Sequence, residues 1–332
     1  MRPAHLGLAV LVSALWGVNF VVIDVGLDHF PPLLFSALRF LVAAVPAVFF
    51  VGRPKVAWKW IIGVGLVLGV GKFGLLFIGM DQGMPAGLSS LVLQIQAVFT
   101  AVIAAVVLRE RPGPVRVAGM AVAVGGVTVA AVDEGASGPL FAFGLLMLAA
   151  VLWGVSNVLT RKAAPADALN WMVWVSVVPP LPLLALSLLF EGPERDLAAL
   201  RALDWTGAGT IVYVAWVVTV FGFGAWGFLL RTYPASTVAP FSLLVPVFGM
   251  SSSAVLLGEG MTGLRWCAAL LLVGGVALAT LPGAGRLRLR MRTTAAAADA
   301  PGPAPAASTA PPPADTSASR TPSTATRPSL PR

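Results

Sequence analysis

Charged residues are scarce in this chain. Asp, Glu, Lys and Arg make up only 11% of its 332 residues, and 58% are hydrophobic. A typical soluble domain carries roughly a quarter charged residues. This composition therefore excludes an ordinary soluble globular protein, and its long apolar runs indicate membrane-spanning segments.

Cysteine and histidine are almost absent. The single cysteine, Cys267, excludes an internal disulfide, and the two histidines, His5 and His29, provide no Cys/His metal cluster. No P-loop string and no HExxH motif occurs. The sequence therefore predicts no metal or other cofactor and no ATP hydrolysis. The net charge is +8, but the basic residues lie beside the apolar runs rather than in one stripe, so no nucleic-acid partner is expected.

The apolar runs predict ten helices that cross a membrane. Helices are required because lipid offers no hydrogen-bond partner to bare backbone groups, and no barrel-like alternation is present. Most runs are close to the ~20 residues needed to cross the hydrocarbon layer. The predicted helices span residues 6–26, 31–51, 60–80, 85–108, 114–132, 139–160, 168–190, 205–230, 235–257 and 262–282.

The distribution of Lys and Arg predicts the orientation. Ahead of the C-terminal tail, fourteen basic residues fall in segments on the same side as the N-terminus, and only Arg195, Arg201 and Arg265 fall on the other side. By the positive-inside rule, both ends of the chain are predicted to be cytoplasmic. Residues 286–332 are rich in Ala, Pro, Ser and Thr, so we expect a disordered tail. Its start, "RLRLRMR", is predicted to border the membrane and to contact anionic lipid headgroups.

The two halves of the chain repeat each other. At an offset of 149, "RERPGPVRVAGMAVAVGGVTVA" (109–130) matches "GEGMTGLRWCAALLLVGGVALA" (258–279). Earlier in each half, "LWGVNFVVI" (15–23) resembles "LWGVSNVLT" (152–160). Each copy, predicted as 1–135 and 136–285, contains five crossings. An odd number of crossings inverts the second copy, which is the design of secondary transporters. The fold class is therefore predicted as an all-α membrane protein built from two inverted five-helix repeats.

Four motifs carry a resemblance to a known family. The strings "ALWGVNFVVIDVGL" (14–27), "PPLLFSALRFLVAAVPAVFFV" (31–51), "GMPAGLSSLVLQIQAVFTAV" (83–102) and "APFSLLVPVFGMSSSAVLLGE" (239–259) occur in this order. They resemble the drug/metabolite transporter superfamily, within it the EamA-type exporters, and most of all those that carry O-acetylserine and cysteine.

The resemblance implies a function and a place. We expect a secondary transporter that exports amino acids or related small metabolites by alternating access, in the bacterial cytoplasmic membrane. Its partners would be a small-molecule substrate and membrane lipids, and a homodimer stays open. A drug or another metabolite as cargo also stays open. The resemblance further implies that the fifth and tenth helices are peripheral.

Two basic residues within the predicted spans are candidates for binding a substrate. Arg39 lies about eight residues into its span, and Lys72 lies in the middle of another, within "GVGKFG". A buried cation is costly unless it faces protein or water. Arg39 could hold a carboxylate, or it could be a structural pin that bonds helix-end carbonyls. Lys72 could join it in an electropositive cavity, or reach the interface on its long side chain.

Amides and tryptophans at matching places in the repeat are further candidates. Asn19 and Asn157 follow Trp16 and Trp153 by about one turn in the two copies. An amide offers both a donor and an acceptor to a substrate, although it could equally hold two helices together.

The fourth predicted helix and several prolines add to this set. Gln94 and Gln96 are two residues apart on a predicted helix, so at most one should face a cavity squarely, and we favour Gln94. Pro240 and Pro246 in the ninth predicted helix and Pro180 in the seventh are predicted helix breaks, which could line a cavity, act as hinges or be static kinks. Glu110 and Glu259 repeat at helix ends, where we expect them to cap helices or pair with arginines.

Two other classes of protein remain as alternatives. A membrane enzyme would need a nucleophile with its base, or metal ligands, which the predicted spans do not supply. A structural or signalling protein would not need buried cations or a duplicated bundle.

Overall fold

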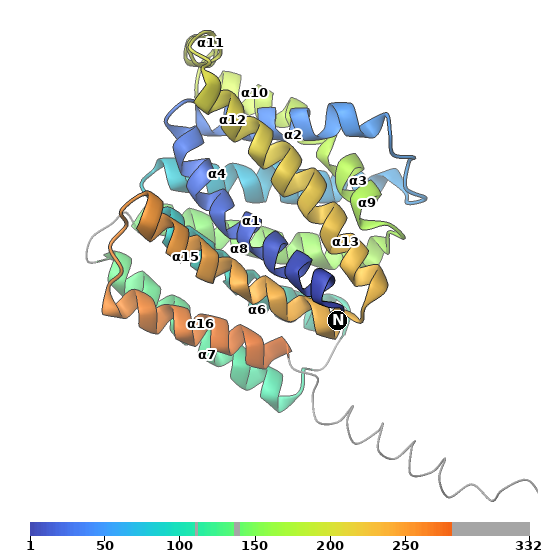
Figure 1. Cartoon of the computed structure of the whole chain (residues 1–332), viewed down its shortest axis with the longest axis vertical. Coiled ribbons are helices and arrows are strands. Elements are labelled where there is room, and N and C mark those ends of the chain that lie inside the picture. Colours follow the sequence, from blue (N-terminus) through green and yellow to red (C-terminus); the bar gives the residue numbers. More distant parts are fainter. Residues whose placement is uncertain (110–111, 136–139, 281–332) are drawn as a thin grey trace, which may run out of the picture. The chain divides into compact units, whose positions relative to one another are not determined.

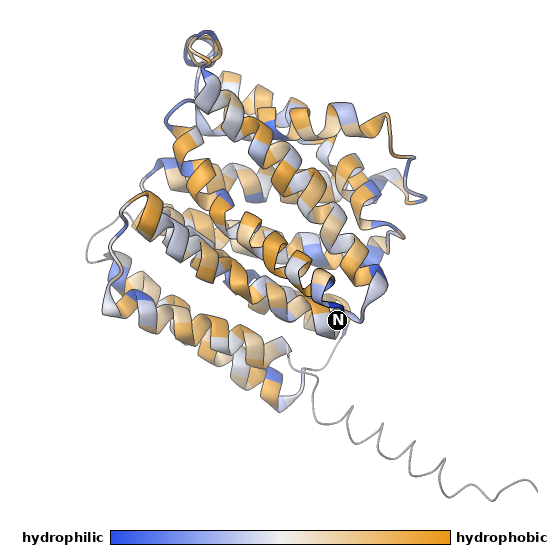
Figure 2. Cartoon of the chain, viewed as in Figure 1, coloured by the Kyte–Doolittle hydropathy of each residue, from blue (hydrophilic) through white to orange (hydrophobic). Residues whose placement is uncertain are grey.

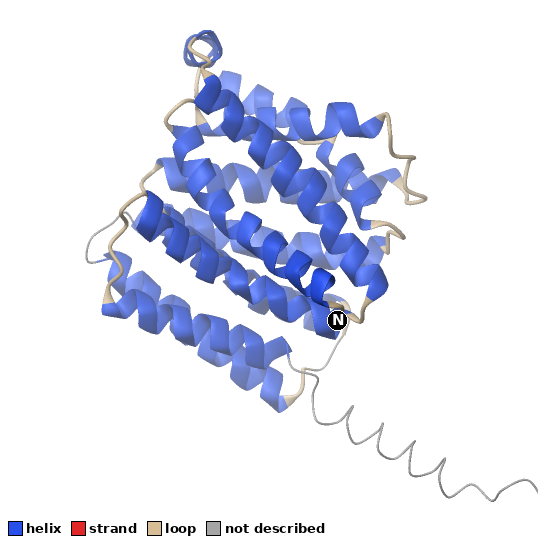
Figure 3. Cartoon of the chain, viewed as in Figure 1, coloured by secondary structure: helices blue, strands red, loops and turns tan. Residues whose placement is uncertain are grey.

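The computed structural model describes residues 1–109, 112–135 and 140–280, and all regular structure in these ranges is helical (Figure 3). The described helices belong to the compact unit formed by residues 1–284. This confirms the predicted all-α class. Glu110 and the predicted tail, 286–332, lie outside the described residues.

The helices of the first half follow the predicted order (Figure 1). They are α1 (Pro3–Leu27), α2 (Pro32–Val48), a third crossing of α3 (Trp58–Val64), η1 (Gly65–Phe73) and α4 (Gly74–Asp81), a fourth of α5 (Ala86–Val92), η2 (Leu93–Ile95) and α6 (Gln96–Val107), and α7 (Pro114–Gly135). η1 is a π-helix and η2 is a 3₁₀-helix.

The second half repeats this order, except that two helices take the place of α2 and one short helix is added. Its segments are α8 (Leu140–Ala163), α9 (Ala168–Ser176), α10 (Pro180–Phe190), α11 (Pro193–Arg201), α12 (Trp205–Val212), η3 (Tyr213–Gly222), α13 (Phe223–Thr232), α14 (Ala235–Val238), η4 (Ala239–Leu243), α15 (Leu244–Leu256) and α16 (Gly263–Thr280). η3 is again π-helical and η4 again 3₁₀.

Hydrophobic residues run along most of each helix, and hydrophilic residues gather at the ends and in the connections (Figure 2). Within the described residues, nine helical segments are long and apolar enough to cross a membrane. The remaining apolar helix, Pro32–Val48, has 17 residues, the lower end of the ~17–25 that span a bilayer. The chain is thus a multi-pass membrane protein, while the predicted count of ten spans is not confirmed.

Some predicted boundaries differ from the structure, since the predicted helix 31–51 ends at Val48. The predicted helix 168–190 is interrupted at residues 177–179, because Pro179 and Pro180 cannot continue the hydrogen-bond ladder, and a break at Pro180 was predicted. The short helix α11 was not predicted at all. Its signals are present, since it begins with a proline, has acidic residues in its first turn and ends on Arg201. It was missed because its sequence is polar and the search followed apolar runs.

The first helix of each half packs against helices of the other half, and the two sets of contacts are equivalent. α1 packs against α15 and η3, and their counterparts in the other half repeat this, with α8 packed against α6 and η1. α2 packs against α10, and α7 against α16. Contacts of this kind are those that a two-fold rotation between the halves requires, as an inverted repeat predicts.

The π-helical segments obey the same relation. Shifted by the offset of 149, residues 65–73 become 214–222, which coincides within one residue with η3 (Tyr213–Gly222). π-helical turns are rare and are frequent at functional sites. Their appearance at equivalent places in both halves marks the middle of the third and eighth crossings.

α7 and α16 form a peripheral pair. Each of these two helices contacts the other far more extensively than it contacts any other helix. The resemblance implied that the fifth and tenth helices are peripheral. Glycine permits this contact, because a Cβ at Gly126 would lie 2.6 Å from the backbone nitrogen of Leu272, and a Cβ at Gly275 would meet the backbone nitrogen of Ala123. The neighbouring Gly125 and Gly274 face open space.

Carboxylates join the two halves at the end of the bundle opposite to the N-terminus. Glu259 accepts hydrogen bonds from the backbone amides of Ala86 (2.7 Å) and Gly87 (3.1 Å), at the start of α5. Glu191 accepts from the amides of Leu33 (2.7 Å) and Leu34 (3.1 Å), in the first turn of α2. Each carboxylate therefore satisfies amides that a helix start leaves without partners. For Glu259 this is the predicted capping role.

Ion pairs reinforce the same end. Asp133 accepts from Nε of Arg265 at 3.0 Å, which ties α7 to α16. Nε2 of His29 lies 3.4 Å from Oδ1 of Asp204, the N-cap residue of α12. The backbone amide of Gly207 and, to a smaller extent, His29 lower the pKa of Asp204.

The close approach of the backbones at Gly126 predicts different effects for alanine at two neighbouring glycines. Gly126→Ala should lower the melting temperature of the purified protein, because overpacking typically costs ~1–3 kcal/mol. Gly125→Ala, one residue away and facing open space, should leave it unchanged or raise it slightly. Thermal unfolding in detergent, followed by size-exclusion chromatography, measures both. Equal stability of the two variants would contradict the proposed backbone contact.

The orientation has its own test. The exposed Cys267 is first replaced by serine, and single cysteines are then placed at Lys55, Lys162 or Arg195. In intact cells, a membrane-impermeant maleimide should label only the Arg195→Cys variant. If Lys55→Cys and Lys162→Cys were found on opposite faces of the membrane, the predicted crossings would be wrong.

Candidate substrate-binding site

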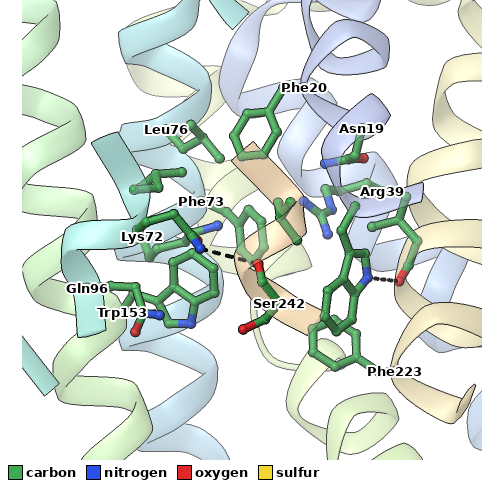
Figure 4. A pocket seen from close by; sticks show the side chains of 15 residues that line it. Asn19, Phe20, Arg39, Lys72, Phe73, Leu76, Gln96, Trp153, Phe223 and Ser242 are labelled. Carbon is green, nitrogen blue, oxygen red and sulfur yellow. Dashed lines mark hydrogen bonds between the residues drawn. The ribbon is translucent and has the colours of Figure 1, made fainter. Parts of the chain in front are cut away.

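A cavity of about 150 Å³ lies among the crossings, and its walls come from both halves of the chain (Figure 4). α1, α2, η1, α4, η2 and α6 contribute from the first half, and α8, η3, α13, η4 and α15 from the second. Its lining consists of Trp16, Asn19, Phe20, Arg39, Lys72, Phe73, Leu76, Leu93, Gln94, Gln96, Trp153, Val218, Phe223, Ser242 and Val245.

Arg39 is buried at the wall of this cavity, with only 2% of its surface exposed. Its Nη2 donates a hydrogen bond to Oγ1 of Thr219 at 3.2 Å. The guanidinium carbon lies 4.0 Å from the ring centroid of Phe73 and 4.8 Å from that of Phe40. Nε and Nη1 have no hydrogen-bond partner among the described residues. The side chain therefore holds a fixed charge with unused donors.

Lys72 stands on the same aromatic ring. Its Nζ lies 3.4 Å from the centroid of Phe73 and 4.5 Å from that of Trp153. Because Arg39 and Lys72 both lie within 4.0 Å of the Phe73 centroid, the two charges are at most about 8 Å apart. None of the described residues that line the cavity is Asp or Glu. Ring faces and one hydroxyl thus replace the carboxylates that usually neutralise buried cations.

The π-helical segments supply the partners that fix these groups. Lys72 and Phe73 end η1 itself. In η3, Oγ1 of Thr219 donates to the carbonyl of Val214, five residues earlier, at 2.9 Å, so its oxygen is held in place to accept from Arg39. Nε1 of Trp16 donates to the carbonyl of Val218 at 3.2 Å. Two carbonyls of the π-helix η3, those of Val214 and Val218, therefore accept side-chain hydrogen bonds that fix Thr219 and Trp16.

Asn19 and the two glutamines bring neutral polar groups to the cavity. Asn19 is buried, and its Oδ1 has no hydrogen-bond donor among the described residues. Nε2 of Gln94 donates to the carbonyl of Ser242 at 3.4 Å. Gln96 lines the cavity as well, with its Oε1 accepting from Nδ2 of Asn157 at 2.8 Å.

Both glutamines line the cavity, although their spacing predicted that at most one would face it squarely. That prediction assumed a regular α-helix, in which residues two apart point in nearly opposite directions. Residues 93–95 instead form the 3₁₀-helix η2, whose tighter winding of ~3 residues per turn brings the two glutamines closer to one face. Sequence analysis therefore set aside a residue of the cavity wall.

Asn157 does not line the cavity. It donates to Oε1 of Gln96 at 2.8 Å and to Oγ1 of Thr100 at 3.1 Å, so it joins α8 to α6 behind the wall. This is the interhelical role that the sequence left open. The crossing formed by α9 and α10 contributes none of the cavity residues in the part of the chain that the structure describes. The other sequence candidates Trp16, Asn19, Arg39, Lys72, Gln94 and Trp153 all meet at the cavity (Figure 4).

The three prolines lie at changes of helix type. Pro180 begins α10 after the break, Pro240 lies in the 3₁₀-helix η4, and Pro246 lies in the first turn of α15. η4 contributes Ser242 to the cavity. A hinge role for these prolines stays a prediction.

The polar groups of the cavity suit binding rather than covalent chemistry. It offers two cations, amides, a hydroxyl and aromatic faces. Across the described residues, no group of three or more His, Cys, Asp or Glu side chains is arranged to hold a metal ion. Such an arrangement can hold an anionic group and an apolar or amide part beside it.

A family model for the EamA-like transporter family matches residues 5–132 and again 140–281. The chain belongs to this family. It is therefore a transporter and not an enzyme. The two matches fall on the two halves whose helices repeat each other.

Two relatives share this family over most of their length. A protein of Salmonella typhimurium strain LT2, described as a probable amino-acid metabolite efflux pump, is 45% identical over 276 residues, which cover 81% of this chain and 92% of that protein. A protein of Escherichia coli strain K12 with the same description is 41% identical over the same coverage. A solved crystal structure matches with a TM-score of 0.59 and 19% identity, covering 85% of this chain and 99% of that one, which shows the shared fold.

Phe73 is a residue that sequence analysis missed, and it gives a prediction. Phe73→Leu should destabilise the protein by at least about 2 kcal/mol, because both cations lose a ring face. Phe77→Leu removes a similar volume, but its ring centroid is 5.8 Å from the Arg39 guanidinium carbon. A double-mutant cycle between Phe73→Leu and Lys72→Met, measured by thermal unfolding, should show coupling of about 1 kcal/mol. The same cycle with Phe77→Leu should show little, and equal coupling in both would contradict the role of Phe73.

Proposed function

We propose that this transporter exports a small amino-acid metabolite whose carboxylate binds between Arg39 and Lys72. The observation that carries the proposal is the pair of buried cations with no carboxylate among the described cavity residues. A carboxylate of the cargo offers acceptors to Nε and Nη1 of Arg39, which have none in the described structure. It also neutralises charge where an unpaired cation is most costly.

The relatives support this choice of cargo. The proteins of Salmonella typhimurium and Escherichia coli, at 45% and 41% identity, are described as probable amino-acid metabolite efflux pumps. Amino-acid metabolites share a carboxylate, which is the group that the two cations would recognise. The sequence resemblance to exporters of O-acetylserine and cysteine leads to the same class.

The volume of the cavity weighs against a large drug as cargo. It measures about 150 Å³, about the size of an engineered cavity that holds benzene. Pockets for drug-sized ligands usually measure ~300–1,000 Å³. A small metabolite therefore fits this conformation better than a drug does.

Alternating access would use the contacts between the halves. At the end opposite to the N-terminus, Glu191 and Glu259 hold helix starts of the other half. At the N-terminal end, the hydroxyl of Tyr233 contacts the backbone nitrogen of Arg2 (3.1 Å) and the ring of His5 (2.9 Å). Rocking one half against the other would open one set of contacts while the other set stays closed. The chain carries no P-loop string, so the energy would come from a gradient.

The role of Arg39 has a direct test. Arg39→Ala should reduce export from proteoliposomes at least about 30-fold, because removing one partner of a buried charge pair costs ~2–5 kcal/mol. Arg39→Lys should also lose most activity, since an ammonium lacks the fork of the guanidinium. Arg53→Ala, in an exposed connection where the side chain stacks on Trp58, is the matched control and should transport normally. Full transport by well-folded Arg39→Ala protein would refute the carboxylate anchor.

A further inference from the structure

The cavity carries more positive charge than one zwitterion can balance. Arg39 and Lys72 lie at most about 8 Å apart around Phe73, and the described lining contains no Asp or Glu. An amino acid with a free ammonium group and an uncharged side chain has no net charge. Its carboxylate would be attracted, but its ammonium would be repelled by the same two cations, because charges interact strongly in a site of low dielectric.

The hydrogen-bonding groups show the same imbalance. Asn19 lines the cavity, and its buried Oδ1 has no donor among the described residues. It can accept one N–H, yet as a neutral amide it supplies no charge to offset an ammonium. A neutral amide N–H on the cargo would satisfy this oxygen without adding positive charge.

Apolar surface lies beside these groups. The rings of Phe20 and Phe223 face the cavity. The indole N–H of Trp16 donates to the carbonyl of Val218, so the rest of its ring forms an apolar part of the wall. These surfaces can cover a short acyl chain. Charge, hydrogen bonding and shape therefore favour the same chemical class.

We propose that the cavity selects net-anionic amino-acid metabolites whose amine is acylated, in preference to zwitterionic amino acids. This inference rests on the proposed function. The carboxylate binds Arg39 and Lys72, the amide N–H donates to Oδ1 of Asn19, and the acyl group packs on the aromatic walls. The substrate class is thus defined by the absence of a free ammonium group.

Two isomers provide a matched pair of probes. N-acetylserine is a net anion, and O-acetylserine contains the same atoms but is a zwitterion. Each competes with radiolabelled N-acetylserine for counterflow into proteoliposomes, at mildly acidic pH and short times so that acyl migration is negligible. N-acetylserine should compete at least tenfold better, a difference of about 1.4 kcal/mol. The uncharged N-acetylserinamide, which lacks the carboxylate, should compete least.

The outcomes separate the two levels of the proposal. If O-acetylserine is carried as well as N-acetylserine or better, the preference for acylated cargo is wrong and the proposed function stands. If the protein neither binds nor carries any of these compounds or free amino acids, the proposed function fails, and this inference fails with it.

Asn19→Asp adds a gain-of-function test. A carboxylate at this position would pair with an ammonium, so the variant should shift the preference toward O-acetylserine at least tenfold. Asn170→Asp is the control, because Asn170 also has a buried Oδ1 without a donor among the described residues but does not line the cavity. Lys72→Gln, which removes one cation, should reduce the preference for N-acetylserine over O-acetylserine. It replaces Asn19→Asp as the test if Asn19→Asp protein does not fold. An unchanged ratio in folded Asn19→Asp or Lys72→Gln protein would overturn the inference.

Discussion

Two positive charges around one phenylalanine ring are the constraint on which the centre of this protein depends. A guanidinium and an ammonium held near each other inside a membrane protein would ordinarily be paired with carboxylates. Here the ring of Phe73 lies within 4.0 Å of both, the indole of Trp153 covers the ammonium, and Thr219 receives one guanidinium hydrogen. These weaker partners leave the charges available to a ligand.

The surrounding architecture keeps this arrangement in place. The π-helical segments η1 and η3 occupy matching positions in the two halves. η1 carries Lys72 in its last turn, and η3 presents Thr219 to Arg39. α1 and α8, which carry Trp16 and Trp153, pack against η3 and η1 in turn. The peripheral pair α7 and α16 gives no residue to the cavity among those described. Both halves therefore contribute walls to the cavity, while the last helix of each half lies at the periphery.

The all-α membrane class and the order of the helices could be predicted from the sequence, because the repeat and the apolar runs are strong signals. Arg39 and Lys72 stood out because a charge inside an apolar run is rare, and both lie at the cavity. Phe73 did not stand out, since one phenylalanine among many apolar residues carries no mark. The place of Gln96 in the cavity wall was not expected, because it follows the 3₁₀-helix η2, which residue spacing does not reveal. For Asn157 the sequence left both a binding role and an interhelical role open, and the structure shows the interhelical hydrogen bonds. The π-helical turns were not predicted either, because apolar periodicity says nothing about which carbonyl an amide selects.

Both halves of the chain line the cavity, but among the described residues its positive charges come from one half only. Both cations come from the first half, and the matching segments of the second, residues 213–222 and 168–190, contain no Lys or Arg. In a fully symmetric chamber a bound molecule would have two equivalent poses, related by the rotation axis. Charge on one wall removes one of them, so the proposed cargo would keep a single orientation relative to the membrane normal. In the proposed transport cycle, its carboxylate would stay on the same wall whichever side of the cavity opens, and the cargo would not have to turn between entry and release.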